Sequence, residues 1–188
     1  VTNDPLQGGV VVDTLRAAVK LWNDFAAATP AARGIITIMD NATYDEALQG
    51  QRRIILPPGA KLAIVAGAWP DIRRADGTRR RTPGEVTPLN RRPYLTGAMT
   101  VEGLAAGEED GGSLFVDGIA TGGGIVLRKD ADLGRLSLHN CTVGAKDGAL
   151  SQMISCTGGN TRANITLDRS ICAGLSLTGP AGELVITR

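Results

Sequence analysis

One short pattern recurs four times in the second half of this chain. Each copy has an aliphatic residue at its first and third positions and then turn-forming or polar residues; the copies span 114–118, 136–140, 165–169 and 184–188. Their first positions are 22, 29 and 19 residues apart. Aliphatic alternation between turn signals predicts β-strands, and recurrence every 20 to 30 residues or so predicts the stacked coils of a solenoid.

Stacked coils place the same position of every copy in one column. Neighbouring strands lie about 4.8 Å apart, and one coil cannot bury its own apolar face, so the coils must stack on one another. Branched aliphatic side chains pack well on such a pleated surface. The two predicted inward columns are Leu114, Leu136, Ile165 and Leu184, and Val116, Leu138, Leu167 and Ile186.

These strand-turn units resemble the right-handed parallel β-helix of the pectate-lyase-like superfamily. Residues 113–121 and 134–143 (SLFVDGIAT and GRLSLHNCTV) look like coils of β-helix proteins encoded with phage tails and contractile injection particles. The resemblance implies an all-β solenoid over residues 35–188 and an extracellular or particle-associated location. An antiparallel sandwich or jelly roll is the alternative, but the column alignment and the scarcity of two-residue hairpin turns favour the β-helix.

The first part of the chain predicts a helix that covers the end of this solenoid. Asp13 is a candidate N-cap for an amphipathic helix within residues 13–29, and its apolar stripe includes Trp22 and Phe25. The first coil would otherwise expose unpaired backbone and an open apolar bore, so we expect the helix to cap it. We therefore expect residues 1–188 to form one β-helix domain. Because the sequence begins at Val1, we also expect it to be a fragment of a longer chain.

Composition narrows the classes of function. Glycine is frequent, with 25 residues, and aromatic residues make up 3%, which suits a narrow aliphatic core with tight corners. The net charge of +1 gives no overall positive field that would attract nucleic acid. The sequence has no run of about 18 apolar residues, so it predicts no membrane-spanning helix. The spacing of Cys141, Cys156 and Cys172 fits no zinc-ligand pattern, and buried thiols are the simplest interpretation of all three.

Residues 68–93 interrupt the coil pattern. They hold seven arginines and several prolines, which predicts a long loop excursion from a coil corner. Arg79, Arg80 and Arg81 are candidate anion-binding residues, for phosphate or an acidic polysaccharide. A solvated loop without a ligand is the simpler interpretation.

One set of residues is a weak candidate for catalysis. His139 is the only histidine, and the chain has neither a Gly-x-Ser-x-Gly motif nor a P-loop, so we expect no metal or cofactor. Asp117, His139 and Asp168 share one outward position, which would separate the two carboxylates by about 10 Å. Inverting glycosidases hold theirs roughly 6.5–9.5 Å apart. A solvated polar ladder beside a turn is the simpler interpretation.

These features favour a non-catalytic structural or adhesive module, associated with a phage tail or contractile injection particle by resemblance, that binds glycans along one face. The alternative is a polysaccharide lyase or glycoside hydrolase acting on a surface polysaccharide. The acidic cluster, calcium site or basic catalytic residue that the resemblance implies for such enzymes cannot be mapped onto this chain. The strand at 184–188 is followed by no lid, so we expect this edge to continue or to pair with another subunit.

Overall fold

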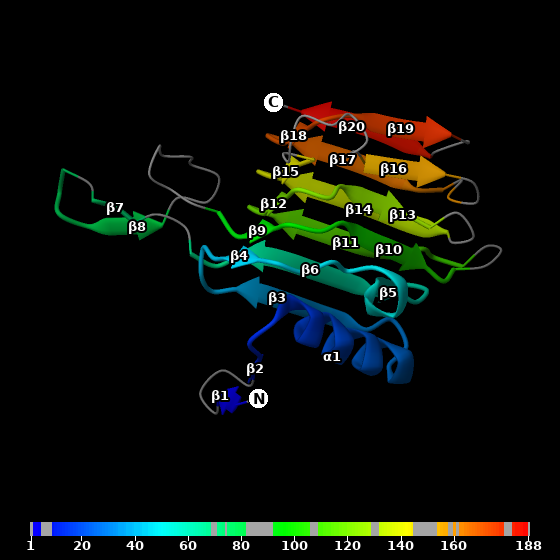
Figure 1. The fold of residues 1–188 in the computed structure, drawn as a ribbon, viewed down its shortest axis with the longest axis horizontal. Coiled ribbons are helices and arrows are strands. Elements are labelled where there is room, and N and C mark those ends of the chain that lie inside the picture. The colour runs from blue at the N-terminus through cyan, green and yellow to red at the C-terminus, as the bar shows by residue number, and fades with distance from the viewer. Residues whose placement is uncertain are drawn as a thin grey trace.

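The protein is a stack of coils built from three all-parallel sheets (Figure 1). The structure is a computed structural model, and it describes residues 2–4, 9–68, 71–73, 75–81, 92–105, 109–128, 132–144, 154–157, 160, 162–178 and 182–187. Within these residues, five successive coils each contribute one strand to every sheet, and β20 begins a sixth. This is the predicted parallel β-helix, and the parallel pairing excludes an antiparallel sandwich.

The three sheets are named here sheets 1, 2 and 3, in the order in which the chain visits them. Sheet 1 consists of β3 (Arg33–Ile38), β6 (Lys61–Ala66), β11 (Gly112–Asp117), β14 (Leu133–His139), β17 (Asn164–Asp168) and β20 (Glu183–Thr187). Sheet 2 consists of β4 (Thr43–Tyr44), β9 (Tyr94–Leu95), β12 (Ala120–Thr121), β15 (Thr142–Val143) and β18 (Ile171–Cys172). Sheet 3 consists of β5 (Ile54–Leu56), β10 (Met99–Gly103), β13 (Ile125–Leu127), β16 (Ile154–Thr157) and β19 (Leu175–Thr178).

The strand register confirms both predicted columns, and it confirms that Leu62 and Ile64 of the preceding coil fit them. The first column pairs Leu62, Leu114, Leu136, Ile165 and Leu184 in succession. The second pairs Ile64, Val116, Leu138, Leu167 and Ile186. The members on β6 to β17 are buried, whereas Leu184 and Ile186 on β20 are 39% and 64% exposed. The core is therefore a continuous aliphatic stack that opens at β20.

Helix α1 (Leu15–Ala28) packs against β3 and β5, at the end of the stack where Figure 1 shows it. Its N-cap is Thr14, whose side-chain oxygen accepts a hydrogen bond from the backbone N–H of Ala17 at 3.1 Å. The expectation that Asp13 would cap the helix is wrong by one residue. Phe25, expected in the apolar stripe, is 47% exposed. Leu15, Val19, Trp22 and Ala26 form the buried face.

Trp22 fills the inward column where the first coil lacks a side chain. Gly34 pairs with Leu62 and so occupies the first-coil position of that column. A Cβ at Gly34 would lie 2.8 Å from Cε3 of Trp22, so the indole already takes that space. The indole N–H donates to the backbone oxygen of Ile55 at 2.9 Å. The amide of Asn23 pairs with the oxygen of Arg53 and the N–H of Ile55, which satisfies the free edge of β5.

The corner from sheet 1 to sheet 2 repeats in three coils. Gly118, Asn140 and Arg169 directly follow β11, β14 and β17, and their φ angles are +75°, +51° and +46°. Left-handed backbone of this kind favours Gly and is tolerated by Asn, so Asn140 suits this turn position.

Further elements lie outside the coils or connect their strands. β1 (Thr2–Asp4) pairs antiparallel with β2 (Gly9–Val11), and a 3₁₀ turn, η1, spans Gly50–Arg52. The excursion between β6 and β9 contains an antiparallel hairpin of β7 (Asp71–Arg73) and β8 (Arg79–Arg81) (Figure 1). The hairpin was not predicted. Among the helices of the described residues, none has the length and apolar character needed to cross a membrane.

Candidate functional site

The predicted polar column is assembled on the outer face of sheet 1. Asp117 pairs with His139, and His139 pairs with Asp168, so the three residues follow one another on β11, β14 and β17. The Nδ1 atom of His139 lies 3.2 Å from an Oδ of Asp168. The coil alignment alone therefore identified residues that the fold does bring together.

Both carboxylates of this column are engaged by neighbouring side chains. Asp117 accepts a hydrogen bond from the amide of Asn140 at 2.7 Å, and Asp168 accepts one from the hydroxyl of Thr187 at 2.9 Å. The Thr187 hydrogen bond, together with the positive charge of Arg169, lowers the pKa of Asp168. A glycosidase needs one carboxyl with a raised pKa as its general acid, and Asp168 is shifted the other way.

Phe115 lies on β11 beside this column, and its ring contacts the ring of His139. The centroids of the Phe115 and His139 rings are 4.8 Å apart, with a 42° angle between the planes. In register, Phe115 is flanked by Ala63 on β6 and Ser137 on β14. Because the ring points outward and is half-buried, it is available as an apolar platform on the face of the sheet.

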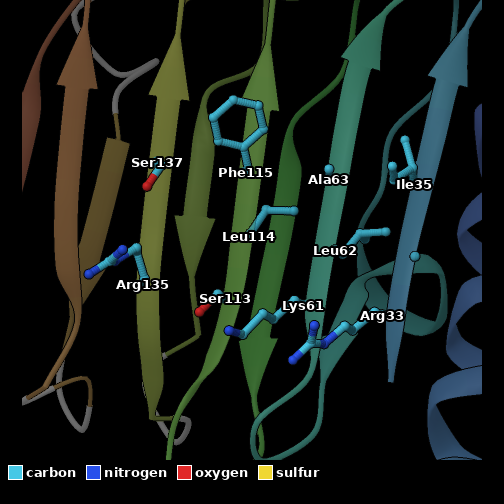
Figure 2. Close-up of a pocket in the computed structure, with 11 residues that line it drawn as sticks. Arg33, Ile35, Lys61, Leu62, Ala63, Ser113, Leu114, Phe115, Arg135 and Ser137 are labelled. Atoms are coloured by element: carbon cyan, nitrogen blue, oxygen red, sulfur yellow. The ribbon is translucent and has the colours of Figure 1, made fainter. Parts of the chain in front are cut away.

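A shallow groove crosses β3, β6, β11 and β14 on this same outer face (Figure 2). Figure 2 shows Arg33, Lys61 and Arg135 toward the starts of their strands, with Phe115 and Ile35 further along. We call Arg33, Lys61 and Arg135 the basic row. All three are exposed. This row was not predicted from the sequence, although Lys61 and Arg135 directly precede Leu62 and Leu136 of the first inward column.

The arginine-rich excursion gives a different result. The backbones of Arg79, Arg80 and Arg81 form β8, but their side chains lie outside the described part of the structure. Their role in anion binding therefore stays a prediction. Arg92, at the end of the excursion, donates a hydrogen bond to the backbone oxygen of Asn140 and so supports a coil corner.

A buried carboxylate on the outer face of sheet 3 has a structural explanation. Glu102 is 9% exposed and pairs with Arg53, while Nη1 of Arg128 lies 3.1 Å from its other oxygen. The three residues come from three successive coils. A carboxylate held between two guanidinium groups is satisfied and has no free side for chemistry, so we assign it to coil stacking.

The cysteines and acidic residues form no metal centre within the described ranges. Cys141, Cys156 and Cys172 are all free thiols, and burial raises the pKa of Cys141 to about 11. In the parts of the chain that the structure describes, no group of three or more His, Cys, Asp or Glu side chains is arranged to hold a metal ion.

No protein-family model, curated protein or solved structure matches this chain. The candidate site is the outer face of sheet 1. This face carries the basic row, an apolar strip of Ile35, Ala63 and Phe115, and the polar column described above. These groups can hold an elongated ligand through charge, stacking and hydrogen bonds.

Proposed function

We propose that this chain is a non-catalytic structural or adhesive β-helix module that binds glycans along the outer face of sheet 1. The observation that carries the proposal is the contrast between a continuous aliphatic stack and a polar column whose carboxylates are held by neighbours. A stack of paired coils is a stiff scaffold, and its outward side chains form a long surface along the described coils.

The strand-turn units support a more specific context for this module. They resemble the pectate-lyase-like superfamily and, within it, β-helix proteins of phage tails and contractile injection particles. We propose that this chain belongs to such a particle, where a rigid surface that holds glycan without cleaving it would serve attachment. Fold alone does not determine activity, so the proposed binding role rests on the side chains of the site, whereas the particle context rests on the resemblance of the strand-turn units.

An assay of polysaccharide cleavage tests the non-catalytic part of the proposal. The wild-type chain is incubated with acidic and neutral polysaccharides, and new reducing ends and unsaturated products are measured. We expect neither above the buffer blank. If cleavage is found and is lost in Asp117→Asn or Asp168→Asn, but retained in the exposed control Asp24→Asn, the chain is an enzyme.

A polysaccharide lyase or glycoside hydrolase is the second candidate, and one observation favours it. The fold does align Asp117, His139 and Asp168 on one face, next to an exposed groove. The same assay decides between the two candidates, because only the enzyme releases products.

Self-association through β20 is a further part of the proposed assembly role. The two inward positions of β20, Leu184 and Ile186, are exposed in this chain, and β20 is the outermost described strand of sheet 1. Exposed edges that carry apolar residues pair readily with other strands. Sedimentation velocity over a range of concentrations should show association that Leu184→Ser with Ile186→Ser removes; a purely monomeric wild-type chain would contradict it.

A further inference from the structure

The basic row places like charges side by side where the sheet favours opposite charges. Arg33 pairs directly with Lys61, and Ser113 alone separates Lys61 from Arg135. Strands in a sheet are about 4.8 Å apart, so three cations lie within four strands. Like charges directly opposite one another destabilise a sheet, so this arrangement carries a cost in the free protein.

Within the described residues, none of these three cations forms an ion pair with a carboxylate. The ion pairs of the described side chains involve other cations: Arg16, Lys20, Arg53, Arg128, His139, Arg162 and Arg169. The whole chain has a net charge of only +1, so the basic row is a local concentration of positive charge and not a sample of a basic surface. A local field of this kind attracts anions.

The next outward column along the strands is apolar, and its first side chain, that of Ile35, is exposed. Ile35, Ala63 and Phe115 follow one another in register, two residues along from the basic row. Ile35 is 72% exposed, which is high for an isoleucine on a sheet. Ser113 adds a hydroxyl group that can donate and accept hydrogen bonds, whereas Ser137 lines the groove but is buried.

We infer that this face binds an acidic polysaccharide that lies across β3, β6, β11 and β14. The basic row contacts its carboxylate or sulfate groups, and Phe115 and Ile35 contact the apolar faces of its sugar rings. Arginine and lysine form charge-assisted hydrogen bonds with such groups, which are stronger than neutral ones. This inference rests on the proposed adhesive function and specifies the class of glycan and the residues that hold it.

The composition of the face favours a polysaccharide over two other anionic partners. Proteins that bind single-stranded nucleic acid stack successive bases on several aromatic side chains, and Phe115 is the one aromatic side chain of this groove. Binding to an anionic membrane by insertion needs a broad apolar face, whereas the apolar strip here is one column wide. A sugar chain needs only a narrow platform with flanking charges and hydroxyl groups.

The experiment compares two triple variants that remove the same charge. Arg33→Gln, Lys61→Gln and Arg135→Gln together neutralise the basic row. The matched control combines Lys20→Gln, Arg52→Gln and Arg169→Gln, which remove three other exposed cations. Binding is measured by isothermal titration calorimetry with heparin as the sulfated probe, polygalacturonate as the carboxylated probe and dextran as the neutral one. We expect the wild type to bind heparin, polygalacturonate or both, without binding dextran, and more weakly as salt is added.

The basic-row variant should lose affinity by roughly tenfold or more, because it removes three exposed charge-assisted contacts with the ligand. The control variant should bind like the wild type. Phe115→Ala should also weaken binding, whereas Ile171→Ala, which truncates another exposed apolar side chain on sheet 2, should not. Unchanged thermal unfolding confirms that each variant is folded, and Arg33→Lys with Arg135→Lys should retain binding.

Several outcomes would overturn the inference. These are no binding of either acidic probe by the wild type, full affinity in the basic-row variant, and tighter binding of oligothymidylate or of phosphatidylserine vesicles than of both polysaccharides. The carboxylated and sulfated arms identify which acidic group is recognised. Product release in the cleavage assay overturns the non-catalytic function instead, and it leaves the binding result intact, so the two failures are distinguishable.

Discussion

The contact between Trp22 and Gly34 provides a sharp test of how the helix closes the coil stack. Gly34→Ala adds one methyl group at an inward position, and that methyl would lie 2.8 Å and 2.9 Å from two carbons of the indole ring. The ring cannot move away freely, because it is buried and its N–H is bonded to the oxygen of Ile55. Overpacking of this kind costs about 1–3 kcal/mol. The expected fall in melting temperature is roughly 2 to 12 °C for a chain of this size.

Urea unfolding followed by far-UV circular dichroism measures this cost, and a double-mutant cycle assigns it to the indole. Trp22→Ala alone should lose about 3–5 kcal/mol, because it empties the end of the core. In the Trp22→Ala background, Gly34→Ala should cost nothing further, which is a coupling of about 1–3 kcal/mol. Gly9→Ala is the matched control, since a Cβ there meets no atom within 4 Å. A neutral Gly34→Ala, or the same cost in both backgrounds, would refute the reasoning.

Three further predictions concern the stack, the polar column and the thiols. Leu136→Ala should destabilise the protein by about 2–5 kcal/mol in urea unfolding, whereas Leu104→Ala, at a 49% exposed position, should stay within about 0.5 kcal/mol. The lowered pKa of Asp168 contributes stability above the unfolded-state pKa and loses it as the pH falls through the folded-state value. The stability difference between wild type and Asp168→Asn should therefore shrink as the pH is lowered from about 5 in acid titrations of unfolding. Iodoacetamide at neutral pH should label the half-buried Cys172 before Cys141, because the Cys141 thiol is buried and has a pKa of about 11. Mass spectrometry of digests measures the two labelling rates, and equal rates would contradict the burial of Cys141.

The coil stack was predictable because period-two alternation fixes which side chains face inward. A slip of one residue would turn Leu114 and Val116 to solvent, so each copy of the pattern permits one register only. That register also determined the column of Asp117, His139 and Asp168. The alignment therefore predicted the core and this part of the surface from the same residues.

Arg33 could not be placed in the basic row by the same route, because the first coil lacks the aliphatic residue that marks this position in the other coils. Gly34 stands where the other coils have Leu or Ile, and its place in the core is taken by Trp22 from a distant helix. Without that marker, Arg33 could not be aligned with Lys61. The N-cap was also ambiguous, since Asp13 and Thr14 both have cap-forming side chains. The β7/β8 hairpin was missed because its arginine-rich strand lacks the β-branched and aromatic residues that signal strands.

The shared register of the coils has a consequence for how such proteins can change length during evolution. Each coil meets its neighbours through the same pairing, so loss of the whole coil from β11 to β13 would set Leu62 against Leu136 and Ile64 against Leu138. Loss of only part of that coil would offset all three sheets at once. Deletions and duplications are therefore tolerated in whole turns, and removal of this particular turn would bring Lys61 directly beside Arg135.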